Sequence, residues 1–266
     1  TRFKCDWSSD VCSSDLAANG MIPVFAVYSS FLQRCYDEII HDLSIEKQHV
    51  IIGIDRAGIV GNDGETHQGL FDVAMLSSVP GITVYSPATY EELRKTLYES
   101  IYHQTGVCCV RYPRGGEGKL PAGFAPDEAW SVRSISSKSP RKKLGLVTYG
   151  KETVQVCKAA EQLKEQGVAV SVLKLLHLLP FPEDSLRPLM GCDAILFVEE
   201  GIQSGGIGQM FGEKLLERQY RGEYRILAVD NRFVEQASTD RALALTGLDA
   251  ASIVRTCQTW LGIAAD

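Results

Sequence analysis

The sequence lacks an apolar run of the length that a membrane-spanning helix requires, about 20 residues. Its 27 basic residues do not exceed its 33 acidic residues, and a net charge of −6 argues against a protein that binds a nucleic-acid backbone. With 45% hydrophobic residues, the chain is too apolar for a disordered protein. We therefore expect a globular protein whose partners include neither a membrane nor a nucleic acid.

The cysteines lack the spacings of a redox or zinc site. Among the 8 cysteines there is no Cys-x-x-Cys pair, and no histidine lies at zinc-finger spacing from one of them. The start of the chain also lacks the apolar stretch of a secretory signal. These absences favour a reduced, cytoplasmic protein.

Residues 1–16, TRFKCDWSSDVCSSDL, repeat Ser-Ser-Asp and show neither a helical nor a strand period. Two interpretations are open for this segment. It is either a disordered tail or a foreign junction that does not belong to the protein. The motifs described below begin only at Leu16, which favours the second interpretation.

Strand-like and helix-like segments alternate from Gly20 onward. Residues 21–28 (MIPVFAVY) form a near-continuous apolar run that is typical of a strand buried on both faces. Further strands are expected at 49–55, 82–85 and 107–112, with helices following Ser29 and at 70–77 and 89–104. This alternation predicts parallel strand pairing and a three-layer α/β arrangement.

A glycine- and proline-rich stretch, residues 115–143, interrupts this pattern and predicts a linker with one edge strand near 130–135. A second series of strands and helices begins at Leu144. The expected fold is therefore α/β, with two three-layer α/β/α domains whose sheets are mostly parallel. Their predicted bounds are 17–114 and 144–266, with the linker between them.

Polar side chains follow several of the strands expected in the first domain. Ligands of parallel α/β sheets collect beyond the carboxyl ends of strands. Tyr28 and Arg34 follow the first strand and Arg56 the second, while Arg111 to Arg114 end the fourth. A lone arginine there is usually a surface ion-pair partner, but Arg56 and Arg114 together suit bidentate binding of a phosphate or carboxylate. The loop after the second strand adds Asp63, His67 and Gln68.

A glycine run, Gly201–Gly208, follows a strand and precedes a helix, a context that suggests a dinucleotide site. The spacing fails, because Phe211 stands where the third glycine is required. We interpret the glycines as a site of close helix–strand packing. Glu199 and Glu200, just before them, are either buried functional carboxylates or an exposed strand end, and the sequence leaves both open.

Several motifs resemble those of one enzyme family: YSSFLQRCYDEIIHD, DRAGIVGNDGETHQG, SPATYEELRKTLY, VRYPRG, VEEGIQSGGIG and GLDAASI. From about Leu16 to the end, the chain is similar to the 1-deoxy-D-xylulose-5-phosphate synthases of the transketolase superfamily. The resemblance covers the last two of that family's three domains, the pyrimidine-binding domain and the transketolase-type C-terminal domain. The family forms homodimers and serves isoprenoid, thiamine and pyridoxal biosynthesis.

The resemblance implies a thiamine-diphosphate- and Mg²⁺-dependent transferase that condenses pyruvate with D-glyceraldehyde 3-phosphate and releases CO₂. It implies that Phe31 and Arg34 lie at the cofactor's aminopyrimidine ring. It implies that Tyr28, Arg56 and Arg114 hold the sugar phosphate. By the same resemblance, Asp63 contacts the acceptor and His67 transfers a proton, for which imidazole is suited by a pKa near neutrality.

Two family features have no counterpart in these 266 residues. The activating glutamate of a GIAEQHA-like segment would lie about ten residues before LAANG, where the sequence reads CDWSSDVCSS. The domain that binds the diphosphate and Mg²⁺ through Gly-Asp-Gly and a downstream Asn is absent. We therefore expect a truncated synthase that is inactive alone. The alternatives are a split-gene transketolase-like subunit that needs a partner chain, a non-catalytic interaction fragment and, more remotely, a nicotinamide-dependent oxidoreductase.

Overall fold

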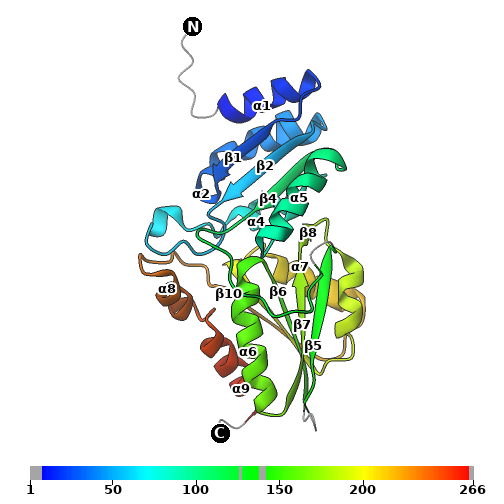
Figure 1. Cartoon of the computed structure of the whole chain (residues 1–266), viewed down its shortest axis with the longest axis vertical. Helices are drawn as coiled ribbons and strands as arrows, with labels where there is room; N and C mark the ends of the chain where they lie inside the picture. Colours follow the sequence, from blue (N-terminus) through cyan, green and yellow to red (C-terminus); the bar gives the residue numbers. More distant parts are fainter. Residues whose placement is uncertain (1–7, 126–127, 138–141, 264–266) are drawn as a thin grey trace.

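The computed structural model describes residues 8–125, 128–137 and 142–263, with side chains from residue 12 onward. It contains two five-stranded sheets, one in the upper and one in the lower half of Figure 1. Within the described residues, no helix is long and apolar enough to span a membrane.

The first sheet has the strand order β1-β2-β4-β3-β8. Its strands are β1 (Val24–Tyr28), β2 (Val50–Asp55), β4 (Val107–Arg111), β3 (Thr83–Tyr85) and β8 (His177–Leu179). The first four are mutually parallel, as the alternating pattern predicted, and β8 pairs antiparallel with β3. The carboxyl ends of β1, β2 and β4 therefore lie at one edge.

Helices cover both faces of this sheet, because alternate residues of a strand point to opposite faces. On one face, Ile52 and Ile54 of β2 pack in the same core as Leu32, Ile39 and Leu43. The other face carries α5, which begins where Thr89 Oγ1 accepts the Glu92 N–H at 3.1 Å. The helical segments are α2 (Ser29–Leu32), η1 (Gln33–Cys35), α3 (Tyr36–Glu38), η2 (Ile39–Ile45), η3 (Glu65–His67), α4 (Asp72–Leu76) and α5 (Tyr90–Tyr102).

The second sheet has the order β10-β9-β6-β7-β5. Its strands are β10 (Glu223–Val229), β9 (Ala194–Ile202), β6 (Lys142–Tyr149), β7 (Val168–Leu175) and β5 (Trp130–Ile135). Four are parallel, and β5 is the edge strand expected within the linker, antiparallel to β7. Its helical segments are η4 (Gly150–Glu152), α6 (Thr153–Glu165), η5 (Glu183–Leu189), α7 (Ile207–Glu217), α8 (Thr239–Thr246) and α9 (Ala250–Leu261).

The two halves share one apolar core. Val147 and Tyr149 of β6 and Phe211 of α7 belong to the same buried cluster as Ile52 and Ile54 of the first sheet. Leu144 and Leu146, on the opposite face of β6, pack instead with α6 and α9. The mostly parallel α/β fold is therefore confirmed. The sequence did not predict that β8, from the second half of the chain, completes the first sheet.

One local expectation was wrong. Strand β1 is an edge strand rather than a strand buried on both faces, and Val24 is 56% exposed. Phe31, which shares its helical spacing with the buried Cys35, Ile39 and Leu43, is 38% exposed. Helix α1 (Ser8–Ala18) lies against β1 and η2, and residues 1–7 fall outside the described part.

Most of the cysteines that the structure describes are buried, as expected for thiols within apolar runs: Cys35, Cys108, Cys109, Cys157 and Cys257. They therefore contribute apolar packing to the two cores.

Candidate active site at the strand ends of the first sheet

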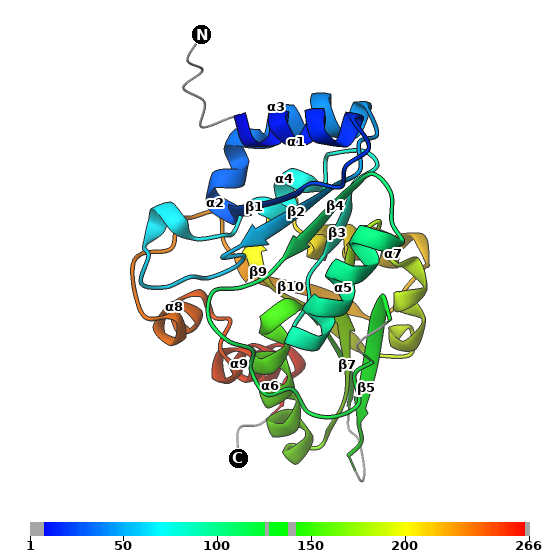
Figure 2. The ribbon, with the colours of Figure 1, turned by 45° about the horizontal axis from the view of Figure 1, so that its top comes forward.

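Parallel pairing brings the polar strand ends together. Tyr28, the last residue of β1, lies in register with Asp55, the last residue of β2, and Ile54 lies in register with Arg111 of β4. The loop of residues 56–69 leaves this edge directly after β2 (Figure 2). The side chains that follow these strands therefore share one site, as the sequence predicted.

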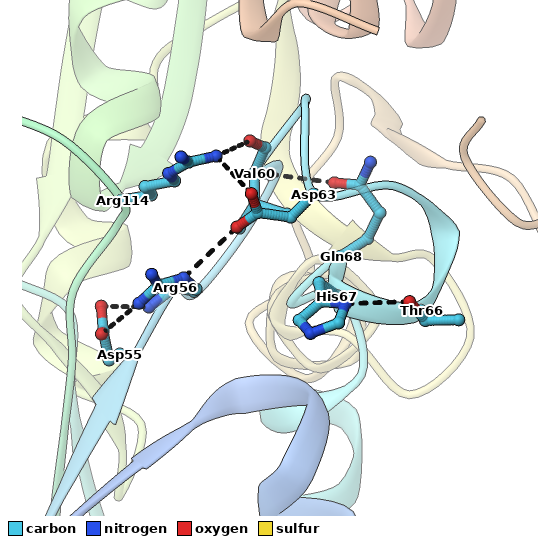
Figure 3. Close-up of polar contacts among 8 residues, drawn as sticks. All are labelled: Asp55, Arg56, Val60, Asp63, Thr66, His67, Gln68 and Arg114. Carbon is cyan, nitrogen blue, oxygen red and sulfur yellow. Dashed lines mark hydrogen bonds and ion pairs between the residues drawn. The ribbon is translucent and has the colours of Figure 1, made fainter. Parts of the chain in front are cut away.

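Two arginines converge on one carboxylate at this edge (Figure 3). Arg114 Nη1 donates to Asp63 Oδ1 at 2.6 Å, and Arg56 Nε donates to Asp63 Oδ2 at 3.3 Å. The Arg114 side chain is 43% exposed and that of Arg56 23% exposed, so solvent reaches both guanidinium groups. Asp63 thus occupies the position that an anionic ligand of two convergent arginines would take.

Arg56 is held in an unusual backbone conformation. Its φ is +57°, a left-handed conformation that costs a residue with a side chain roughly 1 kcal/mol. Asp55 offsets this cost, because its carboxylate accepts the Arg56 backbone N–H at 2.7 Å and the Arg56 Nη1 donor at 2.7 Å. Sequence reasoning missed Asp55 as a site residue, although its place at the strand end, directly before Arg56, was a usable signal.

Planar side chains form a row beside the charged cluster. The Arg56 guanidinium lies 3.8 Å from the centroid of the Tyr28 ring. The Tyr28 ring stacks on Phe31 at 5.5 Å with an interplanar angle of 15°, and Arg34 lies 5.6 Å from the Phe31 centroid. The ring of His67 meets Phe31 edge-on at 5.4 Å. The structure therefore brings these five side chains together.

His67 projects from the short helix η3 within the loop. Its Nδ1 shares a hydrogen bond of 2.8 Å with Thr66 Oγ1, and no described residue bonds its Nε2. A ring fixed through one nitrogen, with the other available to a ligand, is the arrangement that proton transfer requires.

Arg111 and Arg114 belong to one motif but have different environments. Arg111 is 4% exposed and points away from the cluster, where it donates to both carboxylate oxygens of Asp72 at 3.0 and 3.2 Å. Burial alone would lower its pKa, but the charge of Asp72 raises the pKa of Arg111 above the ordinary arginine value. Of the two, only Arg114 reaches the site.

Two side chains of the second domain form hydrogen bonds with the backbone of the loop of residues 56–69. Glu200 Oε2 accepts the Ile59 N–H at 2.9 Å, and Gln236 Nε2 donates to the Asn62 carbonyl at 2.9 Å. Gln68 is buried within the loop, where its Oε1 accepts the Val60 N–H at 2.9 Å. Sequence reasoning left Glu200 open, and it is 9% exposed.

The glycine run packs against Glu199, as predicted for these glycines. The carboxylate of Glu199 accepts N–H groups of Ile207 and Gly208 at 3.2 and 3.1 Å, and the Tyr149 hydroxyl at 2.8 Å. A Cβ at Gly206 would lie 2.5 Å from Glu199 Oε1, and one at Gly208 3.0 Å from it. The start of α7 is therefore filled by the protein's own carboxylate.

Two family models match the chain. The pyrimidine-binding domain of transketolase matches residues 15–117, and the transketolase C-terminal domain matches residues 135–253. One solved structure with a similar fold is described as "Split gene transketolase, inactive beta4 tetramer". The superposition covers 97% of this chain and 82% of the chain in that structure. The TM-score is 0.82 and the sequence identity is 23%.

Curated relatives match over nearly the same range. The 1-deoxy-D-xylulose-5-phosphate synthase of Synechococcus sp. (strain JA-3-3Ab) is 36% identical over 245 residues, which is 91% of this chain and 37% of that protein. The enzyme of that name from Shouchella clausii is 36% identical over 249 residues, 92% of this chain and 39% of that protein. The chain belongs to the transketolase family and contains its pyrimidine-binding and C-terminal domains.

Proposed function

We propose that the site at the ends of β1, β2 and β4 works in a 1-deoxy-D-xylulose-5-phosphate synthase reaction. In this reaction, pyruvate and D-glyceraldehyde 3-phosphate condense with loss of CO₂. The observation that carries the proposal is the convergence of Arg56 and Arg114 on Asp63 next to an exposed aromatic ring. The chain spans about two fifths of the length of the relatives of that name.

The residues present fit the aminopyrimidine ring of thiamine diphosphate. Phe31 is 38% exposed, so part of its ring is available to a ligand. The hydroxyls of Ser29 and Ser30 are buried without a hydrogen-bond partner among the described residues, and both can serve a polar heterocycle. Phe31 would pack on the ring and Arg34 would flank it. The bound cofactor would supply the carbanion chemistry.

The acceptor's phosphate is assigned to Tyr28, Arg56 and Arg114. A phosphate between the two guanidinium groups can form two charge-assisted pairs, each stronger than a neutral hydrogen bond. Displacement of the Asp63 carboxylate by the phosphate would leave Asp63 free to contact an acceptor hydroxyl. Nε2 of His67 would then give or take a proton at the acceptor's carbonyl oxygen.

The Mg²⁺ and diphosphate sites are assigned to residues outside these two domains. Among the described residues, no group of three or more His, Cys, Asp and Glu side chains could hold a metal ion. We propose that turnover requires those groups, and the activating glutamate, from elsewhere in a homodimeric cytoplasmic enzyme, and that these 266 residues alone do not turn over. Turnover by the purified chain with cofactor and both substrates would contradict this.

Binding of D-glyceraldehyde 3-phosphate, measured by isothermal titration calorimetry, tests the proposal. A charge-assisted pair contributes about 1.5–3 kcal/mol, so Arg114→Ala is expected to weaken binding about 10- to 100-fold. Arg255→Ala, which removes an exposed arginine of α9, is the matched control and is expected to bind like the wild type. Equal affinity in all three proteins would contradict the assignment of the phosphate site.

A second candidate is a transketolase-type subunit whose diphosphate-binding domain is a separate chain. The close superposition on 82% of a split gene transketolase chain favours it. Addition of a separately produced diphosphate-binding domain distinguishes the two. Restored turnover supports the split enzyme, whereas tight association without turnover points to a non-catalytic interaction fragment.

A further inference from the structure

The loop of residues 56–69 carries three of the proposed site residues, Arg56, Asp63 and His67, yet its own hydrogen bonds are few. A pair of bonds at its base joins Gly58 and Gly69, at 2.7 and 2.8 Å. Within the loop, the N–H groups of Gly64 and His67 donate to the carbonyls of Gly61 and Gly64. The second half of the chain adds two further bonds to the loop backbone, at Ile59 and at Asn62. In Figures 1 and 2 the cyan loop lies beside the orange segment that leads into α8.

Glu200, at the carboxyl end of β9, makes the most buried of these contacts. Its Oε2 accepts the Ile59 N–H at 2.9 Å, three residues beyond Arg56. The neighbouring Gly58 has φ +84°, and a Cβ there would lie 2.3 Å from the same oxygen. Backbone and carboxylate therefore approach so closely that only glycine is accommodated at position 58.

Glu152, in η4, is 1% exposed and lines the same small cavity as Glu200. If it is ionised, neither of its carboxylate oxygens has a hydrogen-bond donor among the described residues. If it is protonated, its O–H can donate to Glu200. Burial and the neighbouring charge and hydrogen bond of Glu200 raise the pKa of Glu152 well above that of an ordinary glutamate.

Other titratable groups surround this pair of glutamates. The small cavity beside it, about 20 Å³, is lined by groups that include Arg111 of β4, Tyr112, Tyr149 of β6 and Lys151 of η4. Asp249, before α9, adds a negative charge that acts on Glu152, and Glu200 acts on Arg111. Arg111 is already paired with Asp72, so it does not neutralise two ionised glutamates.

We propose that Glu152, in its protonated form, donates a hydrogen bond to Glu200, and that this pair of the C-terminal domain positions the loop of residues 56–69 through the Ile59 N–H. Glu152 and Glu200 are positioning residues, since neither lies at the ligand-binding cluster. The inference rests on the proposed function for the roles of Arg56, Asp63 and His67. The order of the loop itself does not depend on that function.

Amide hydrogen exchange on peptides that cover residues 56–69 tests the inference without any ligand or turnover. Glu200→Ala is expected to raise exchange in the loop at least tenfold, because Ile59 loses its acceptor, while β6 and β9 exchange as in the wild type. Glu152→Gln keeps a donor toward Glu200 and is expected to exchange within twofold of the wild type. Glu152→Leu has no donor and is expected to resemble Glu200→Ala.

Glu213→Ala, on the exposed face of α7, is the matched control for loss of one glutamate. Unchanged loop exchange in Glu200→Ala, with β6 and β9 intact, would overturn the inference. So would a Glu152→Gln variant that exchanges as fast as Glu152→Leu, because the shared proton would then have no role. Faster exchange in β6 and β9 of Glu200→Ala would signal general unfolding, and the comparison of Gln with Leu at position 152 then decides.

The pH supplies a second readout that a purely steric role would not move. Exchange in the loop of the wild type, divided by that of Glu152→Gln at the same pH, is expected to rise with pH as Glu152 loses its proton. A ratio that stays constant would overturn the proton-sharing step. Neither result depends on whether D-glyceraldehyde 3-phosphate binds, so failure of the proposed function and failure of this inference are separable.

Discussion

Replacement of Asp72 by alanine is expected to destabilise the fold more than any other single loss of an ion pair described above. Asp72 is 1% exposed and Arg111 4% exposed. They form two hydrogen bonds, from Arg111 Nε and Nη2, at 3.0 and 3.2 Å. Alanine would leave the Arg111 guanidinium buried with a hydrogen bond to Ser86 and the face of Tyr149, but without its hydrogen-bonded carboxylate.

Loss of one partner from a buried ion pair costs about 3–5 kcal/mol. For a protein of this size, 1 kcal/mol shifts the melting temperature by about 2–4 °C, so Asp72→Ala is expected to lower Tm by roughly 6–20 °C. Urea denaturation followed by circular dichroism measures the free energy of unfolding directly. Glu217→Ala, which breaks an ion pair whose glutamate is 61% exposed, is the control and is expected to cost under about 0.5 kcal/mol.

The double variant Asp72→Leu with Arg111→Met separates charge from packing. Apolar residues of similar volume commonly replace a buried ion pair at little or no cost, so the double variant is expected to recover most of the lost stability. A loss below about 1 kcal/mol in Asp72→Ala would refute the reasoning, because the buried charge would then be solvated by another group. A double variant as unstable as Asp72→Ala would show that the loss of stability comes from altered packing geometry and not from the unpaired charge.

Three further outcomes follow from the structure. Phe31→Ala is expected to lower the free energy of unfolding by only about 1–2 kcal/mol, less than the loss of a fully buried phenylalanine would. Calorimetry on the same variant is expected to show loss of thiamine diphosphate binding, and unchanged binding would contradict the stacking role. Gly208→Ala places a Cβ 3.0 Å from Glu199 Oε1 and from Ile226 Cγ2, so urea denaturation is expected to show a free energy of unfolding lower by about 1–3 kcal/mol. Gly191→Ala, whose new Cβ would have no atom within 4 Å, is the control. Equal losses of stability in the two variants would refute the clash. Because the pKa of Glu152 is raised in the fold, its stabilisation is complete below the ordinary glutamate pKa and is lost as the pH rises. The stability of Glu152→Gln relative to the wild type is thus expected to increase from about pH 5 to about pH 8, and a flat difference would contradict the shift.

Much of the site could be predicted because its signals are local in the sequence. Tyr28, Arg56 and Arg114 each follow a strand, and parallel pairing places such residues at one edge whatever the details of packing. The glycines near Gly208 predicted close packing between a helix and a strand, and the structure shows that they approach the carboxylate of Glu199. The mostly parallel pairing within both sheets follows from the alternation of strand and helix patterns.

Other features depend on which distant segments meet, and a periodic pattern carries no information on that. Arg111 and Arg114 read alike in the sequence, but one is buried against Asp72 and the other reaches the cluster. Phe31 shares its spacing with core residues, and its exposure follows from its place at the strand ends beside Tyr28 and His67. Val24 is exposed because β1 lies at the edge of its sheet, although the sequence of this strand is almost entirely apolar.

The sequence by itself determined the α/β class, the positions of most strands and the set of charged groups that follow them. Only the tertiary structure decided that β8 joins the first sheet and that Glu200, paired with Glu152, holds the loop of residues 56–69. The physical reason is that helix and strand periods reflect burial of one segment's own faces. Contacts between segments that lie far apart in the sequence are selected by the packing of the whole core and by the pairing of buried charges and hydrogen-bonding groups.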